Sequence, residues 1–344
     1  MRVVPLVDVA LQPGSVVWPV DGDVEREFSV SLLYNGSELY GGEVSLAIDG
    51  WPAPAAQRFS FDRSGESRRF VFSVARPSNV VDARVAVRAV VVGDDRRTFN
   101  RSVRLVEYPH IRPTAMVYPA RSVIRVARIS TPPLARVGYV RGAADRVPEA
   151  LSQMGVPVEV LSGDDLAGAD LSVYDVIVVG SRAYEADSAL TEHNDRLLAY
   201  TRSGGLLVVQ YQQYQFVRGA YAPYRIEINR PHDRVTDETA PVRILRPDSP
   251  VFTTPNRIGP EDWIGWPQER GLYFAGEWDD AYLPLVETND AGRPPLQGGL
   301  LVARYGSGTY VYTGLSFFRS LPAGNPGALR LFLNLLGLKP EHVQ

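Results

Sequence analysis

The sequence predicts two domains in series, a β-sandwich followed by an α/β domain built on a parallel sheet. Residues 1–107 consist of short strand-like runs divided by turns, whereas strand-like and helix-like segments alternate from residue 136 onward. A proline-rich stretch, 108–135, lies between them. The chain of 344 residues is also longer than one hydrophobic core usually serves, so its length alone favours two domains.

The first domain is predicted as a sandwich because apolar and polar residues alternate over short runs. The segments FSVSLLY and ARVAVRAVVV show this period of two, which is typical of strands with one buried face. Turn sequences such as Asn35-Gly36 and Gly93-Asp94 separate the runs. About seven short strands in this length are typical of an immunoglobulin-like sandwich. The expected strands are 3–11, 27–34, 42–48, 57–61, 68–74, 83–92 and 98–106.

The stretch 108–135 contains five prolines and no sustained period, so we expect a connector that holds the domain boundary. One strand, 122–129, is possible within it and would pair with a neighbouring sheet. The last residues, 339–344, are expected to form a tail.

The second domain, 136–338, is predicted to be flavodoxin-like. The run VYDVIVVG is almost continuously apolar, as a strand buried on both faces requires. Alternating strands and helices imply right-handed crossovers and a parallel sheet, whose ligands bind at the carboxyl ends of the strands. A late hairpin around Gly306-Ser307-Gly308 should form an antiparallel appendage. The expected strands are 136–142, 156–163, 173–180 and 206–211, and the expected helices are 147–154, 190–201 and 326–336.

Composition excludes several classes of function. The net charge of −3 does not favour a nucleic-acid partner, because phosphate binding normally needs clustered positive charge. The absence of cysteine excludes disulfides, thiolate metal sites and a cysteine nucleophile. No apolar run approaches the length of a membrane span. Lys339 is the only lysine, which indicates a high-GC bacterial coding bias.

The N-terminal sequence carries no export signal. We nevertheless expect a bacterial protein that is exported to the periplasm or the exterior as part of a longer precursor.

The segment 255–280 combines three of the five tryptophans with eight charged side chains and follows neither a helical nor a strand period. Long irregular segments in compact domains are usually functional or deliberately packed. Trp263 and Trp266 beside Glu269 and Arg270 could stack on sugar rings and bind their hydroxyl groups. In the alternative interpretation the tryptophans fill the interface between the sheet and the appended hairpin, and Glu269 and Arg270 form a partly buried ion pair.

The sequence offers little for catalysis. GYVRGAAD is not a dinucleotide fingerprint, and Ser181 after the strand 173–180 has no evident base partner, so it is interpreted as a turn residue. His232 is the only histidine placed to act, with Asp233 or Glu269 as its carboxylate. Adjacent acidic residues such as Asp279-Asp280 are more often a solvated loop than a metal site. We therefore expect no catalytic residue, no metal and no cofactor in this chain.

Several segments of the second domain resemble a known family. GYVRGAADRVPEALSQMG, DVIVVGSRAY, RLLAYTRSGGLLVVQY and GGLLVARYGSGTYVYTGLSFFRSLPAGNPGALRLFLNLL, together with the segment around DWIGWPQERGLYF, are similar to the C-terminal region of long bacterial PIG-L (LmbE-like) deacetylases. The resemblance covers essentially all of 136–338. It implies an accessory region, because the zinc deacetylase domain of that family, with its A-H-P-D-D motif, has no counterpart in this sequence.

The α/β domain also resembles the class I glutamine amidotransferase and ThuA-like superfamily. The cysteine nucleophile of that superfamily would fall near Tyr211 and Gln212, just after LLVVQY. This chain has no cysteine, so the resemblance implies the scaffold and its strand-end pocket without the nucleophile.

We therefore predict a non-catalytic accessory module that binds a glycan, an amino sugar or a partner domain, such as an upstream deacetylase domain. The alternatives are a hydrolase that uses His232 with a carboxylate, and a structural or oligomerisation module. The candidate ligand-binding residues, all expected at the carboxyl edge of the sheet, are Arg182, Tyr184, Gln210, Tyr211, Trp263, Trp266, Gln268, Glu269 and Arg270.

Overall fold

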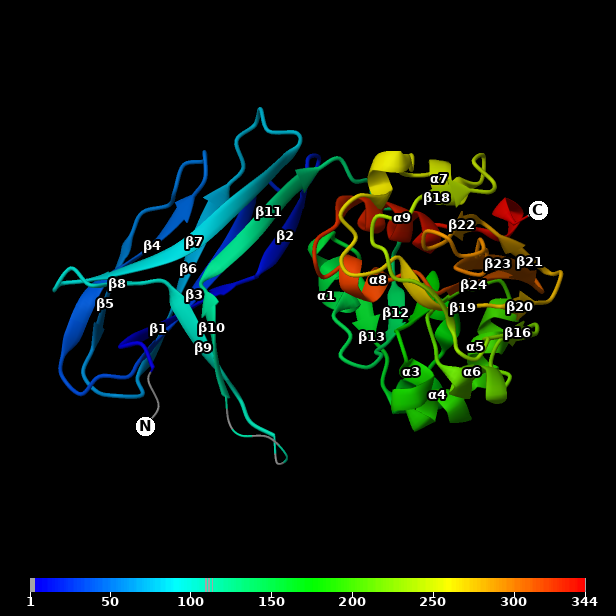
Figure 1. The fold of residues 1–344 in the computed structure, drawn as a ribbon, viewed down its shortest axis with the longest axis horizontal. Coiled ribbons are helices and arrows are strands. Elements are labelled where there is room, and N and C mark those ends of the chain that lie inside the picture. The colour runs from blue at the N-terminus through cyan, green and yellow to red at the C-terminus, as the bar shows by residue number, and fades with distance from the viewer. Residues whose placement is uncertain (1–3, 109, 111, 113, 344) are drawn as a thin grey trace. The chain divides into compact units, whose positions relative to one another are not determined.

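The computed structural model describes residues 4–108, 110, 112 and 114–343. The chain is rich in β-structure and divides into two compact units, Met1–Arg128 and Ile129–Gln344, which are described separately (Figure 1).

The first unit consists mainly of two β-sheets. One sheet has the order β1-β3-β6, and the other has the order β2-β11-β7-β4-β5, with the short β8 paired to β7. A separate two-stranded ribbon is formed by β9 and β10. The strands are β1 (Val7–Gln12), β2 (Ser15–Pro19), β3 (Glu25–Tyr34), β4 (Tyr40–Ile48), β5 (Gln57–Phe61), β6 (Ser67–Ala75), β7 (Ala83–Gly93), β8 (Thr98–Phe99), β9 (Arg101–Val106), β10 (Thr114–Pro119) and β11 (Arg121–Ala127).

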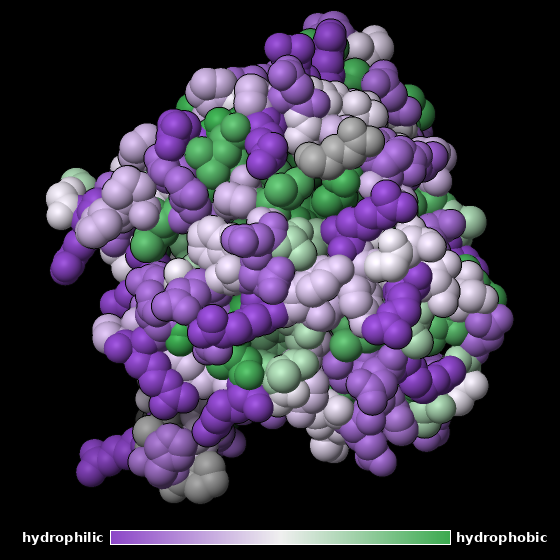
Figure 2. Space-filling view, turned by 90° about the vertical axis from the view of Figure 1, so that its right-hand side faces the viewer, coloured by the Kyte–Doolittle hydropathy of each residue, from purple (hydrophilic) through white to green (hydrophobic). Residues whose placement is uncertain are grey.

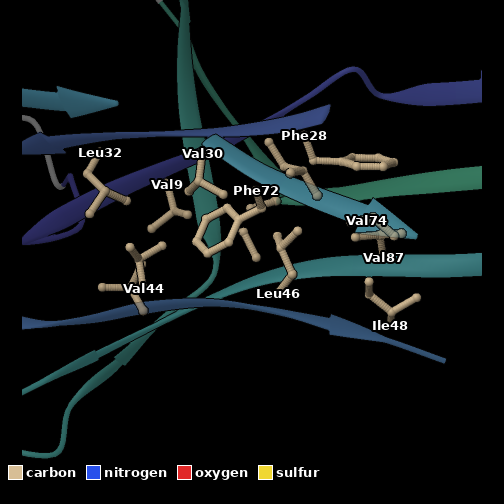
Figure 3. Packing of buried hydrophobic residues seen from close by; sticks show 14 of the residues in the cluster. Val9, Phe28, Val30, Leu32, Val44, Leu46, Ile48, Phe72, Val74 and Val87 are labelled. Carbon is tan, nitrogen blue, oxygen red and sulfur yellow. The ribbon is translucent and has the colours of Figure 1, made fainter. Parts of the chain in front are cut away.

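One hydrophobic core lies between the two sheets. Alternate residues of β3, such as Val30 and Leu32, are buried, and they face Val44 and Leu46 of β4 across the core (Figure 3). This is the period-two burial expected of a sandwich.

Every strand predicted in 1–107 is present, although residue 3 of the first lies outside the described residues. Two strands, β2 and β10, were not predicted. The predicted connector 108–135 is largely wrong, because β10 and β11 occupy most of it and β11 pairs with both β2 and β7. The unit consequently extends to residue 128 rather than 107. The possible strand at 122–129 corresponds to β11.

The second unit is built on a seven-stranded sheet with the order β13-β12-β14-β15-β24-β23-β21. The first five of these strands are parallel, and β23 and β21 continue the sheet in antiparallel fashion. The predicted hairpin is therefore part of the main sheet, since its second strand is the fifth parallel strand. The strands are β12 (Val137–Val140), β13 (Val158–Val160), β14 (Val176–Val179), β15 (Leu206–Gln210), β21 (Tyr282–Pro284), β23 (Leu300–Tyr305) and β24 (Gly308–Thr313).

The long connection between β15 and β23 contains short antiparallel ladders that lie outside this sheet. They pair β16 with β20, β17 with β19, and β18 with β22. The strands are β16 (Ile226–Glu227), β17 (Asp233–Val235), β18 (Val242–Ile244), β19 (Gly271–Phe274), β20 (Glu277–Trp278) and β22 (Val286–Thr288).

Helices cover the sheet on both faces, and α9 and α5 lie on opposite sides of β24 in Figure 1. The predicted helix 190–201 is divided into α4 and α5 at His193. The helix 326–336 has its predicted bounds because Asn325 caps its first turn and Pro326 occupies the first position. The helices are α1 (Val147–Gln153), α2 (Gly163–Gly168), η1 (Leu171–Val173), α3 (Ala183–Ala186), α4 (Ser188–Glu192), α5 (Asn194–Arg202), α6 (Tyr214–Arg218), α7 (Pro250–Thr253), η2 (Pro260–Trp263), α8 (Phe317–Ser320), α9 (Pro326–Leu336) and η3 (Pro340–His342).

Within the described part of the chain, no helix is both long and apolar enough to span a membrane.

Two buried asparagines hold α9 to the chain that precedes η2. The Asn334 side chain donates to the carbonyl oxygens of Asn256, at 2.7 Å, and Val251, at 2.9 Å. Its Oδ1 accepts from the backbone nitrogen of Asn256 at 2.9 Å. The Asn256 side chain in turn exchanges hydrogen bonds with both backbone groups of Ser130. The first residues of the unit and its last long helix are thereby joined through two amides.

We expect Asn334→Ala to lower the free energy of unfolding of the second unit by about 3 kcal/mol, because it leaves several buried backbone groups without partners. Asn289→Ala is the matched control. The Asn289 amide also bonds two backbone carbonyls, but it is half-buried, so water can replace it and the loss should be about 1 kcal/mol or less. Chemical denaturation measures both values. Equal losses in the two variants would contradict the role given to the Asn256–Asn334 pair.

Candidate functional site

Polar side chains of the second unit gather where β14 and β15 end. All residues of both strands are buried, so their side chains pack in the core. Ser181 and Arg182 follow β14, and Tyr211 and Gln212 follow β15. Parallel neighbours end at the same edge of a sheet, and the backbone nitrogen of Arg182 donates to the carbonyl oxygen of Tyr211 at 3.0 Å. The two strand ends are therefore in direct contact.

Gln212 fastens these two strand ends together. Its Nε2 donates to the carbonyl oxygens of Gly180 and Gln210, at 2.8 and 2.9 Å. Its Oε1 accepts from the backbone nitrogen of Tyr184 at 3.2 Å. The side chain is fully buried, so it makes these bonds without competition from water. Gln212 was not among the predicted site residues.

Two predicted binding residues, Tyr184 and Gln210, are core residues. Tyr184 is buried and donates its hydroxyl proton to Asn194 at 2.5 Å. Gln210 is buried and donates to the Tyr139 hydroxyl at 2.8 Å, which donates in turn to Asp145 at 2.6 Å. Burial raises the pKa of Tyr139 well above its usual value, so this chain of hydrogen bonds stays neutral at the tyrosine.

Five aromatic side chains pack together beside these strand ends, and we call them the aromatic cluster: Tyr211, Tyr214, His232, Tyr273 and Phe318. The His232 ring lies flat on Tyr273, with ring centroids 3.8 Å apart and planes 5° from parallel. Tyr211 also stacks on Tyr273 at 5.8 Å and packs against Phe318 at 5.0 Å. Tyr211 is buried, whereas the other four rings are partly exposed.

Two ion pairs flank the aromatic cluster. Arg182 binds Glu185 through two hydrogen bonds of 2.9 and 2.5 Å. Arg319 donates to Glu269 at 2.8 Å. Burial raises the pKa of Tyr211 to about 12, while the positive charges of Arg182 and Arg319 act to lower it. The Arg319 guanidinium lies over the Phe318 ring of the cluster, 4.7 Å from its centroid.

Three of the surrounding residues have left-handed backbone conformations. The φ angles are +60° at Arg182, +71° at Gln268 and +53° at Tyr273. This region is unfavourable for side chains other than glycine and often persists at sites of function. Arg182 holds this conformation in the turn between β14 and α3, which orients its side chain.

Trp263, Trp266 and Arg270 face the core. The two indoles stack at 5.4 Å and are 4 % and 1 % exposed, and Trp266 packs on Phe317. Arg270 is also buried, and it donates to the carbonyl oxygens of Ala240 and Trp263. Burial lowers the pKa of its guanidinium. The predicted ion pair of Glu269 with Arg270 is wrong, because Glu269 pairs with Arg319.

The hypothesis of a hydrolase that uses His232 with a carboxylate requires two features, and the structure shows only one of them. His232 lies in the aromatic cluster, close to the strand ends, as that hypothesis requires. Among the described residues, however, no carboxylate accepts a hydrogen bond from its ring, and Asp233 is bound by the Asn229 amide at 2.8 Å. Burial and Arg234 lower the pKa of His232, whereas Asp233 and Glu269 raise it by smaller amounts.

Ser181 and the acidic loops offer no reactive centre. Ser181 is 2 % exposed, so its hydroxyl is closed to a substrate. Glu277, near Asp279-Asp280, pairs with Arg225 at 3.2 Å. Within the described ranges, three or more His, Asp or Glu side chains nowhere gather as metal ligands.

Sequence reasoning missed Glu185, Gln212, Tyr214, Tyr273, Phe318 and Arg319. Phe318 and Arg319 follow β24, whose parallel pairing with β15 was not predicted. Recognising β24 as a parallel neighbour of β15 would have placed both residues at the carboxyl edge. Tyr273 lies on the short strand β19, which carries no strong pattern.

A separate groove of 510 Å³ lies elsewhere in the second unit. Leu245, Leu283, Leu285 and Leu338 are among its lining residues, and none of the predicted site residues is. Figure 2 faces the corresponding side of the chain, where green apolar groups lie in a recess among purple ones.

Comparison with known proteins identifies no family. No family model matches the chain, and no curated protein does. The cold-adapted β-galactosidase from Rahnella sp. R3 is similar over 60 % of this chain and 32 % of its own length, with 18 % identity and a TM-score of 0.36. The chain thus spans about a third of that enzyme.

Two further solved structures give similar results. The exo-β-1,4-mannosidase Op5Man5 from Opitutaceae bacterium strain TAV5 has 11 % identity and a TM-score of 0.33, over 59 % of this chain and 35 % of the enzyme. The CARDB domain of PF1109 from Pyrococcus furiosus has 14 % identity and a TM-score of 0.23, over 36 % of this chain and 87 % of that domain. TM-scores this low assign neither a fold family nor a function.

We expect His232 to titrate below 6.5, because burial and Arg234 both disfavour its protonated form. Glu269→Gln should lower the midpoint further, and Arg234→Gln should raise it. Proton NMR of the imidazole measures each midpoint. Since the folded pKa lies below the unfolded value, His232 should reduce the stability of the fold as pH falls through 6.5. A midpoint above 6.5, or no response to either substitution, would contradict this arrangement.

Proposed function

We propose that the second unit is a flavodoxin-like domain that binds an uncharged saccharide at the carboxyl edge of its sheet, without catalysis. In chain order its five parallel strands are arranged 2-1-3-4-5, an order of doubly wound sheets. Ligands of such sheets bind outside the carboxyl ends of the strands, where the aromatic cluster lies.

The observation that carries this proposal is the combination of partly exposed aromatic rings with ion-paired side chains. Sugar rings present C–H faces that stack on aromatic rings, and hydroxyl groups that bond to planar polar side chains. Tyr214, Tyr273 and Phe318 supply the aromatic surface. Arg182–Glu185 and Arg319–Glu269 supply hydrogen-bond donors and acceptors, and Arg230 lies over the Tyr214 ring at 4.4 Å. The charges cancel within each ion pair, which leaves the polar groups of these pairs free to bond neutral hydroxyls.

The residues found where β14 and β15 end support binding rather than reaction. The left-handed turn after a strand is where a nucleophile stands in enzymes with a nucleophile elbow. In this chain Arg182 occupies that turn, and a guanidinium is not a nucleophile. Tyr211 and Gln212, where the resemblance to class I glutamine amidotransferases would place the nucleophile, are both buried.

We further propose that the chain works as an accessory region of a longer exported bacterial polypeptide, with an immunoglobulin-like first unit. The sequence resemblance to the region that follows the catalytic domain of PIG-L deacetylases supports this. A saccharide-binding site would then hold the substrate polymer near the catalytic domain.

Isothermal titration with a panel of neutral and amino-sugar oligosaccharides tests the binding proposal. We expect measurable affinity for a neutral oligosaccharide, weakened about fivefold or more by Tyr214→Ala and by Tyr273→Gly, since a lost aromatic stack is worth about 1 kcal/mol or more. Glycine suits position 273 because the backbone there is left-handed.

Tyr305→Ala is the matched control. Tyr305 is partly exposed and has Arg202 over its ring, just as Tyr214 has Arg230, but it lies at the end of β23, outside the aromatic cluster. Its loss should leave the affinity unchanged. Flat titrations with every oligosaccharide, or equal losses in all three variants, would refute binding at the aromatic cluster.

A further inference from the structure

The strand β10 has features that edge strands of soluble proteins normally avoid. It pairs with β9 on one side, and its other side is unpaired among the described residues. All six of its residues are exposed, and its sequence, TAMVYP, carries no charge. An exposed apolar edge is a ready template for pairing with another strand, so proteins usually protect it with charged side chains.

Three other edge strands of the first unit show that protection. β6 carries Arg68 and Arg69 on an exposed stretch. β5 carries Arg58, which pairs with Asp94 at 3.0 Å. β1 carries Asp8, whose carboxylate accepts from the backbone nitrogen of Val103 in β9 and so covers the β1 edge. β10 differs from all three.

The ribbon of β9 and β10 also exposes apolar side chains on both faces. Met116 and Tyr118 are 45 % and 42 % exposed, and the Tyr118 hydroxyl contacts the Met116 sulfur, so they share one face. Val117 is 55 % exposed on the other face, together with Leu105, which lies opposite Ala115. In Figure 1 the ribbon runs away from the two sheets of the first unit. Neither face is used by the core of that unit.

We propose that β10 pairs with β10 of a second copy of this chain, in antiparallel orientation about a two-fold axis. The strand is neutral along its whole length, so self-pairing brings no like charges together. The copy also supplies an edge of equal length and equal apolar character. The two ribbons then form one four-stranded sheet, with the exposed apolar side chains of each copy partly covered by the other.

Two-fold symmetry limits the register of this pairing. A strand that pairs with its own copy about an axis perpendicular to the sheet must place one residue opposite itself. In the middle of β10 that residue is Met116 or Val117. The chain has no cysteine, so a single introduced thiol reports on this contact alone.

Sedimentation velocity over a wide range of concentration tests the proposal. We expect a reversible monomer–dimer equilibrium for the unaltered chain. Val117→Lys should weaken the dimer by about tenfold or more, because two lysines then meet near the axis. Leu39→Lys is the matched control, since Leu39 is 74 % exposed in the same unit but outside the ribbon, and its dimer should be unchanged.

Oxidation of Met116→Cys and Val117→Cys, each as a single variant, provides a second readout. One of the two should form a disulfide-linked dimer much faster than the other, since only one position faces its own copy. A chain that stays monomeric at every concentration overturns the proposal. A dimer that Val117→Lys and Leu39→Lys affect equally overturns it as well, because it would use another surface.

Discussion

The central strands of the parallel sheet in the second unit are buried on both faces, and this constraint determines where those strands can carry polar chemistry. Every residue of β14, β15 and β24 is buried. Ile177 and Val179 belong to the core cluster that contains Leu197 and Tyr200 of α5, while Val176 and Val178 alternate with them and are equally buried. Side chains that meet solvent must therefore lie where the strands end.

The strand ends form a defined surface because buried hydrogen bonds fix the loops that follow them. Gln212 joins the loop after β14 to the loop after β15, and Arg182 donates its backbone proton across the same gap. The backbone is left-handed at two residues of this surface, Arg182 and Tyr273. The aromatic cluster therefore depends on the sheet, because residues with a strained backbone keep their conformation only beside rigid neighbours.

The sequence predicted those parts of the fold that depend on local pattern. Alternation identified the strands of the sandwich, and the helix predicted at 326–336 has the bounds of α9. It failed where distant partners decide the outcome. The helix 190–201 is interrupted because Asn194 turns inward to bond the Tyr184 hydroxyl and the Tyr221 carbonyl. β2 was missed because its run is short and ends at a proline, although β11 pairs with it from more than a hundred residues away.

The candidate site was predicted by location more than by residue. Arg182, Tyr211 and Glu269 do lie together around the aromatic cluster. Trp263, Trp266 and Arg270 do not, since they are buried in the core. The sequence could not reveal this, because an irregular run of aromatic and charged residues looks the same whether it faces solvent or a core. The Glu269 partner, Arg319, is 50 residues away in the chain, beyond any local signal. The two are brought together because the segment that follows Glu269 pairs with the segment after β24, through the bridge of Gly271 with Leu315.

The central claim is that Gln212 holds the strand-end loops rigid and so preorganises this surface. Amide hydrogen exchange at Tyr184 tests it most directly, because that backbone nitrogen donates to Gln212 Oε1. The account predicts strong protection at Tyr184 in the unaltered chain and its loss in Gln212→Ala, with the amides of β14 unchanged. Rapid exchange at Tyr184 in the unaltered chain, or equal protection in both proteins, would contradict it.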